Sequence, residues 1–113
     1  MENLEVNSKA STFSESERNQ LTLRLKEALI DAIGAKAIQP NDIGNDEEIF
    51  GPESKLQLDS LDALELINII EVNFDLKVNL QNNSRVIFKS FNTVIDHILS
   101  HANAEKIRAF IAN

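Results

Sequence analysis

Apolar residues recur every three or four positions in several stretches of this chain, and no strand-like alternation continues for more than a few residues. Because an α-helix completes a turn in 3.6 residues, such spacing places apolar side chains on one face of a helix. The clearest example is the series Leu21, Leu25, Leu29 and Ala32. The chain is therefore predicted to be all-α, and four helices in about 90 residues make a small four-helix bundle.

Capping residues and breaks in the apolar spacing mark the ends of these helices. Ser14 and Glu17 fit a capping box ahead of the first helix, and Gly34 is a natural stop. Further helices are expected from 59 or 60 to 74, over 84–89 as a short helix or turn, and from a cap at Asn92 to about 102. The chain is thus divided into a flexible N-terminal tail (1–13), a helical domain (14–103) and a helical C-terminal extension (104–113).

The segment between the first two predicted helices, residues 35–58, is unusual for a linker. Pro40, Gly44, Gly51 and Pro52 rule out a long helix. The segment is nevertheless rich in apolar residues, namely Ile38, Ile43, Ile49, Phe50, Leu56 and Leu58. We expect a long ordered loop whose apolar side chains hold it against the bundle, and loops of this kind are often functional.

Composition narrows the class of protein. The length of 113 residues suits one domain, and the absence of Cys excludes disulfides and thiolate metal sites. No apolar stretch reaches the ~20 residues that a membrane span needs, and residues 1–13 lack the basic-then-apolar pattern of a signal peptide. A cytoplasmic protein without a membrane span is expected.

Acidic residues are concentrated in one part of the chain. The whole chain has a formal charge of −7, yet residues 44–75 contain nine acidic residues and one base, Lys55, and therefore carry −8. A surface of this kind favours a partner with a basic patch and argues against nucleic-acid binding.

The second predicted helix is apolar on two sides. One side forms a sufficient core face, with Ala63, Leu66, Ile67, Ile70 and Phe74. The other side has Leu61, Leu64 and Val72, flanked by Asp62, Glu65, Asn68 and Glu71. Full burial of this helix would hide the carboxylates, which are rarely buried without a partner. An exposed apolar strip with an acidic rim is instead typical of a docking surface.

Ser60 lies at the start of this helix. A Ser or Asp at this place ordinarily caps the helix, but Asp59 can already do so, which leaves the Ser60 hydroxyl free. A phosphodiester on that hydroxyl would lie at the positive end of the helix dipole, which is favourable by roughly 0.3–1 kcal/mol at an exposed site. Ser60 is therefore the candidate attachment site for a phosphate-linked group.

The residues around Ser60 resemble the attachment region of acyl carrier proteins. The similarity includes Ile49-Phe50-Gly51 and the run from Leu56 to Leu66, with the motif Asp59-Ser60-Leu61 at its centre. Glu71, Phe74 and the segment 91–98 resemble the end of the second helix and the last helix of that family. The resemblance covers about 14–102, and this longer pattern is much more specific than Asp-Ser-Leu alone.

The resemblance implies a monomeric, non-enzymatic bundle of acyl-carrier type. A phosphopantetheinyl transferase would attach a 4'-phosphopantetheine arm to Ser60, within the motif that Asp59 and Leu61 complete. The thiol of the arm would hold an acyl group as a thioester during fatty-acid or polyketide-type synthesis, and the arm would supply reach and a high local concentration. Other partners would be acyl-processing enzymes with basic docking patches, such as a ketosynthase, an acyltransferase or a ligase.

Some positions depart from the common fatty-acid carrier pattern. In that pattern the position of Asn68 usually has an apolar residue, and the position of Val72 often has an acidic one. The segment 81–89 is longer than usual and contains Arg85 and Lys89, whereas the family usually has acidic residues there. The longer segment 85–93 is more similar to that of carriers from specialised polyketide or aryl polyene pathways. Two alternatives stay open: an unmodified acidic helical adaptor that uses the same face, and an aminoacyl or peptidyl carrier, although peptidyl carriers often have Gly-Gly before the Ser.

Other candidate sites are weaker. His97 and His101 are four residues apart on a predicted helix, but no third metal ligand is evident near them. The acidic residues near Asp42 and Asp46 do not fit an EF-hand loop. Ser60 lacks the Gly-x-Ser-x-Gly elbow of a hydrolase nucleophile. We therefore expect neither a metal nor a catalytic residue.

Overall fold

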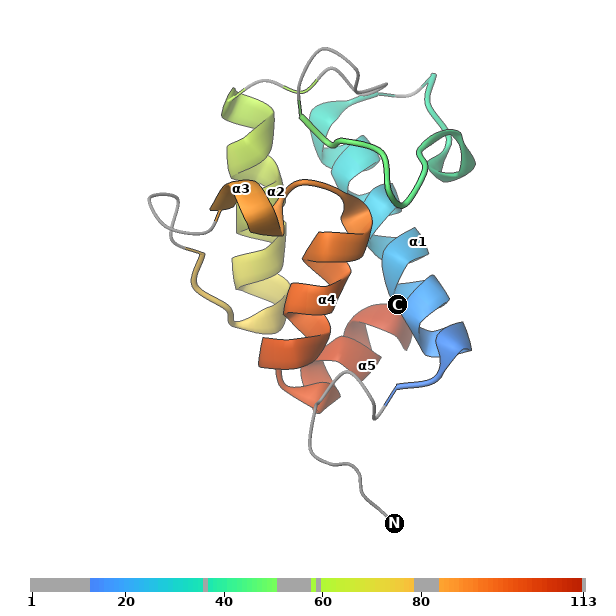
Figure 1. Cartoon of the computed structure of the whole chain (residues 1–113), viewed down its shortest axis with the longest axis vertical. Coiled ribbons are helices and arrows are strands. Elements are labelled where there is room, and N and C mark those ends of the chain that lie inside the picture. The colour runs from blue at the N-terminus through green and yellow to red at the C-terminus, as the bar shows by residue number, and fades with distance from the viewer. Residues whose placement is uncertain (1–12, 36, 51–57, 59, 79–83, 113) are drawn as a thin grey trace.

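The computed structural model describes residues 13–35, 37–50, 58, 60–78 and 84–112 of the chain (Figure 1). The elements in chain order are α1 (Glu15–Ile33), the 3₁₀ turn η3 (Pro40–Asp42), α2 (Ser60–Phe74), α3 (Ser84–Ile87), α4 (Phe91–His101) and α5 (Ala104–Ala112). Helices α1, α2, α4 and α5 pack against one another, and α3 is a single turn that leads into α4. The all-α prediction is confirmed: within the described ranges the regular secondary structure is helical, apart from one isolated bridge between Phe50 and Leu58.

Helix α1 begins and ends where the local sequence predicts. The Ser14 hydroxyl accepts a hydrogen bond from Glu17 N at 3.1 Å, and the Glu17 carboxylate accepts one from Ser14 N at 3.0 Å, which completes the capping box. At the other end Gly34 has a φ of 71°, a left-handed conformation that glycine adopts without a steric penalty. Leu21, Leu25 and Leu29 form the buried face of this helix.

The cap of α4 differs from the prediction. Ser90, not Asn92, is the N-cap: its hydroxyl accepts from Thr93 N at 3.3 Å, and Thr93 Oγ1 accepts from Ser90 N at 3.0 Å. Asn92 lies inside the first turn, where its side chain donates to Asp46 Oδ1 at 2.5 Å. Both Ser and Asn are good N-caps. In this structure the Asn92 side chain binds Asp46 instead of capping the helix.

The C-terminal segment is a separate helix and does not simply extend α4. The chain leaves α4 at Ala102, and Asn103 Oδ1 then accepts from Glu105 N at 2.7 Å at the start of α5. Helix α5 turns back along α1 and α2, where Ile107 is fully buried and the Phe110 ring lies 4.8 Å from that of Phe74. The predicted extension is thus an integral member of the bundle.

The loop after α1 contributes to the core, as its apolar residues predict. Ile43, Ile49 and Leu58 are buried in the same cluster as the helices, and Ile38 and Phe50 pack against it. Gly44 allows a close approach, because Gly44 N donates to Glu47 Oε1 at 2.5 Å and a Cβ at this position would come within 2.7 Å of that oxygen. The prediction for Leu56 lies outside the described residues.

Two further sequence expectations concern the tail and the membrane. Residues 1–12 of the predicted tail lie outside the described residues. Phe13, placed at the end of that tail, is half-buried against the core, and the Arg108 guanidinium lies 4.7 Å from the centre of its ring. No helix in the described part of the chain is long and apolar enough to cross a membrane.

Candidate functional site

Ser60 is the first residue of α2, as the sequence predicts. Two residues earlier, Leu58 is buried in the core and pairs with Phe50, so the chain is fixed to the bundle immediately before the helix starts. The next residue, Leu61, is 71% exposed. Asp59, predicted to cap the helix, lies outside the described residues. A group on Ser60 would therefore begin at the positive end of a 15-residue helix, next to an exposed surface.

Helix α2 separates its apolar residues onto a buried face and an exposed face. Leu66, Ile67, Ile70 and Phe74 are all buried, which confirms the predicted core side. On the opposite side Leu64 is 51% and Val72 70% exposed. We refer to Leu61, Leu64, Asn68 and Val72 as the α2 stripe, because their spacing of three, four and four residues places them in one line about 16 Å long.

The acidic residues beside the α2 stripe are not equivalent. Glu65 is exposed, whereas Asp62 and Glu71 are half-buried. Glu71 Oε2 accepts a hydrogen bond from Val78 N at 3.2 Å, so this carboxylate also holds the chain that follows α2. Glu65 is thus the most accessible of the three carboxylates that the sequence assigns to docking.

Lys26 holds the loop that follows α1. This residue was not among the candidates predicted from the sequence. The side chain is 7% exposed, and its Nζ donates to Ile43 O and Asn45 Oδ1, each at 2.6 Å. The ammonium also lies 5.6 Å from the centre of the Phe91 ring. Burial lowers the pKa of Lys26 below its usual range, while the nearby carboxylate of Glu47 opposes this effect. The sequence feature that could have indicated this role is the position of a basic residue directly after Leu25, at the edge of the apolar face of α1.

The start of α4 holds the same loop from the other side. Asn92 N donates to Asn45 O at 2.9 Å, and Ile49 N donates to Lys89 O at 3.1 Å. Arg18 connects α1 to this end of α4 through an ion pair of 2.7 Å with Asp96 and a hydrogen bond of 3.2 Å to Asn92 Oδ1. Residues 43–50 are therefore fixed to both α1 and α4 before the chain reaches Leu58.

The two histidines of α4, His97 and His101, lie side by side. Their rings stack with centres 4.4 Å apart, and His101 Nδ1 hydrogen-bonds with His97 O at 3.0 Å. Partial burial lowers the pKa of His97, and repulsion from His101 lowers it further. Among the described residues, no three side chains of the His, Cys, Asp or Glu type come together as a metal site.

Comparison with known proteins gives no relative: no family model, no curated protein and no solved structure matches this chain.

Proposed function

We propose that this chain is a cytoplasmic acyl carrier protein that holds an acyl group as a thioester on a 4'-phosphopantetheine arm at Ser60. The arm would present the group to separate enzymes of fatty-acid or polyketide-type synthesis. The chain itself would perform no catalysis, since its role is to carry and to be recognised.

The observation that carries the proposal is the position of Ser60 at the start of a helix with an exposed apolar face. Ser60 begins α2, the α2 stripe starts at the next residue, and the carboxylate of Glu65 lies beside that stripe. An ordinary surface helix would have polar residues where Leu61, Leu64 and Val72 stand. The Asp59-Ser60-Leu61 motif explains why a modifiable hydroxyl and this face occur together.

The residues of the site fit a phosphodiester-linked arm. The hydroxyl of Ser60 would attack the β-phosphorus of coenzyme A and form a new P–O bond, while the adenosine bisphosphate portion leaves and a base takes up the serine proton. The transferase would supply that base. The phosphate would then lie at the N-terminus of α2, where the helix dipole favours a negative charge.

The acidic rim indicates how partners would approach. Residues 44–75 carry a formal charge of −8, so a basic patch on a transferase, ketosynthase, acyltransferase or ligase would be attracted to this side. Leu61, Leu64 and Val72 would then supply apolar contact. The same face would also suit an unmodified adaptor protein, and only arm attachment separates that candidate from a carrier of acyl, aminoacyl or peptidyl groups.

Intact-mass measurement after incubation with coenzyme A and a broad-specificity phosphopantetheinyl transferase tests the proposal. The wild type should gain the mass of one arm, and Ser60→Ala should gain none. Ser100→Ala is the matched control, because Ser100 is an exposed serine on another helix, and it should be modified like the wild type. The absence of a mass gain in the wild type, or an equal gain in Ser60→Ala, would show that the chain is not a carrier at this residue.

A further inference from the structure

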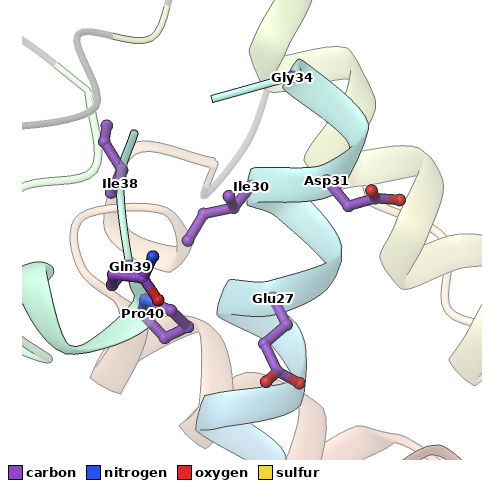
Figure 2. A pocket seen from close by; sticks show the side chains of 7 residues that line it. All are labelled: Glu27, Ile30, Asp31, Gly34, Ile38, Gln39 and Pro40. Carbon is purple, nitrogen blue, oxygen red and sulfur yellow. The ribbon is translucent and has the colours of Figure 1, made fainter. Parts of the chain in front are cut away.

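Apolar side chains reach the described surface at a hollow beside α1 and along the α2 stripe. The hollow, of about 350 Å³, lies at the C-terminal end of α1, where Figure 2 shows Ile30 projecting toward Ile38 and Pro40. Ile30 and Ile38 are half-buried and pack against the core, so the attachment of the loop to α1 accounts for them. The α2 stripe differs, because Leu61 and Val72 remain 71% and 70% exposed.

One residue of the α2 stripe is polar. Asn68 lies four residues from both Leu64 and Val72, so its side chain stands in the same line, one turn from each. Asn68 is exposed, and its side-chain amide makes no hydrogen bond with the described residues. Asn73 on the same helix, by contrast, donates from its side chain to Ile69 O at 2.8 Å. The amide of Asn68 is therefore available to a partner.

This amide limits which surfaces can cover the stripe. A surface that complements Leu61, Leu64 and Val72 is itself apolar at its centre. If that surface extends over Asn68 without a hydrogen-bonding group, the amide loses its water and gains no partner. An unpaired polar group of this kind weakens binding by about fivefold or more. A hydroxyl, amide or guanidinium group opposite Asn68 avoids the loss.

We propose that Asn68 determines the specificity of the docking surface. It selects enzymes that place one hydrogen-bonding group opposite the middle of the α2 stripe, and it disfavours enzymes that are apolar there. This role of Asn68 rests on the proposed function, in which enzymes dock on the stripe. The selected partner would have a basic rim that faces the exposed Glu65, and apolar contacts on both sides of its one polar group. A single Asn in an apolar seam selects coiled-coil partners in the same way.

The rate of arm attachment by a broad-specificity phosphopantetheinyl transferase tests this role. Such an enzyme accepts carriers that differ at this position, so it cannot depend on a hydrogen bond to Asn68 and meets the stripe through apolar contact. Asn68→Leu makes the stripe continuously apolar, and its kcat/KM should be about fivefold or more above that of the wild type. Asn68→Gln keeps an amide and should be modified at close to the wild-type rate.

Asn73→Leu is the matched control. It introduces the same side chain on α2, but position 73 lies about 140° around the helix from Asn68 and therefore off the stripe. Its rate of modification should equal that of the wild type. Thermal unfolding separates docking from stability: Asn68 is exposed, so Asn68→Leu should keep the melting temperature of the wild type.

Three results would overturn the role of Asn68. One is an equal rate of modification for the wild type and Asn68→Leu. Another is a slower rate for Asn68→Leu, which would make the amide a required contact with this enzyme. The third is an equal increase in Asn73→Leu, which would assign the effect to added hydrophobicity anywhere on α2. No mass gain in any of the four proteins would instead contradict arm attachment, and with it the proposed function itself.

Discussion

At the scale of single residues, Lys26 connects α1 to the loop that follows it. It is a buried cation whose ammonium is satisfied by the Ile43 carbonyl and the Asn45 side chain. Its methylene groups continue the apolar face of α1 and pack against the core, while its ammonium group donates the two hydrogen bonds.

The variant Lys26→Met should destabilise the protein by about 1–3 kcal/mol. Methionine retains most of the packing, but it leaves the buried Ile43 carbonyl without its donor. Urea unfolding followed by circular dichroism measures the change. Lys106→Met, at an exposed position of α5, is the control and should stay within about 0.5 kcal/mol of the wild type. Equal stability of the two variants would show that Lys26 does not anchor the loop.

His97 should make the protein sensitive to mild acid. Partial burial and repulsion from His101 hold the pKa of His97 in the folded state below its ordinary value of 6.5. The unfolded chain therefore binds the proton more readily, and stability should fall as the pH drops from 6.5 through the lowered pKa of the folded state.

His97→Gln should accordingly lose less stability than the wild type when unfolding is compared between about pH 8 and about pH 5. His101→Gln removes the repulsion, along with the ring stacking and the hydrogen bond of His101, but leaves His97 partly buried, so its pH dependence should lie between those of the wild type and His97→Gln. If His97→Gln instead has the pH dependence of the wild type, carboxylates elsewhere account for the acid sensitivity.

At the scale of elements, α2 has a buried apolar face and an exposed apolar face. Leu66 is fully buried, whereas Leu61 is 71% exposed on the same helix. Truncation of Leu66 to Ala should cost about 2–5 kcal/mol, the range for a leucine lost from a core. Leu61→Ala should change stability by less than about 0.5 kcal/mol but should slow arm attachment, because the transferase would lose an apolar contact.

The pair of variants is measured by urea unfolding and by the rate of mass gain with the transferase. Leu66→Ala should have a much lower unfolding free energy than the wild type. Leu61→Ala should keep the unfolding free energy of the wild type but should be modified more slowly. A normal rate of modification in Leu61→Ala would remove this residue from the docking surface even if Ser60 is modified.

At the scale of the whole molecule, α5 makes the bundle a single packed unit. It contacts α1, α2 and α4, buries Ile107 completely and packs the Phe110 ring at a tilt of 60° against Phe74. The domain limit expected at 103 therefore falls between two helices that share one core.

Removal of residues 104–113 should lower the unfolding free energy by several kcal/mol. The loss of Ile107 alone corresponds to about 2–5 kcal/mol, and the Phe74–Phe110 pair adds about 0.5–1.5 kcal/mol. Since domains of this size are stable by about 5–15 kcal/mol, the truncated chain should melt at a much lower temperature. Ile107→Ala in the full chain should reproduce a large part of the effect in thermal unfolding. An unchanged melting temperature after truncation would show that α5 is dispensable.

The sequence alone determined the features that depend on neighbours along the chain. The capping box of Ser14 and Glu17, the stop at Gly34 and the start of α2 at Ser60 could be predicted because their hydrogen bonds or helical spacing involve residues a few positions away. The two faces of α2 could be predicted for the same reason, since helical periodicity fixes which side chains share a side. The docking role of the α2 stripe and arm attachment at Ser60 stay predictions.

Only the tertiary structure decided the features that depend on distant partners. Ser90 and Asn92 were both acceptable caps, and the contact of Asn92 with Asp46 gives Asn92 another role. Lys26 became a buried anchor because the loop placed a carbonyl and an amide oxygen 17 and 19 residues away within reach of its ammonium. Helix α5 turned back because the bundle offered an apolar surface for Ile107 and Phe110. Helical periodicity fixes which side chains share a face, but only the assembled core determines what that face meets.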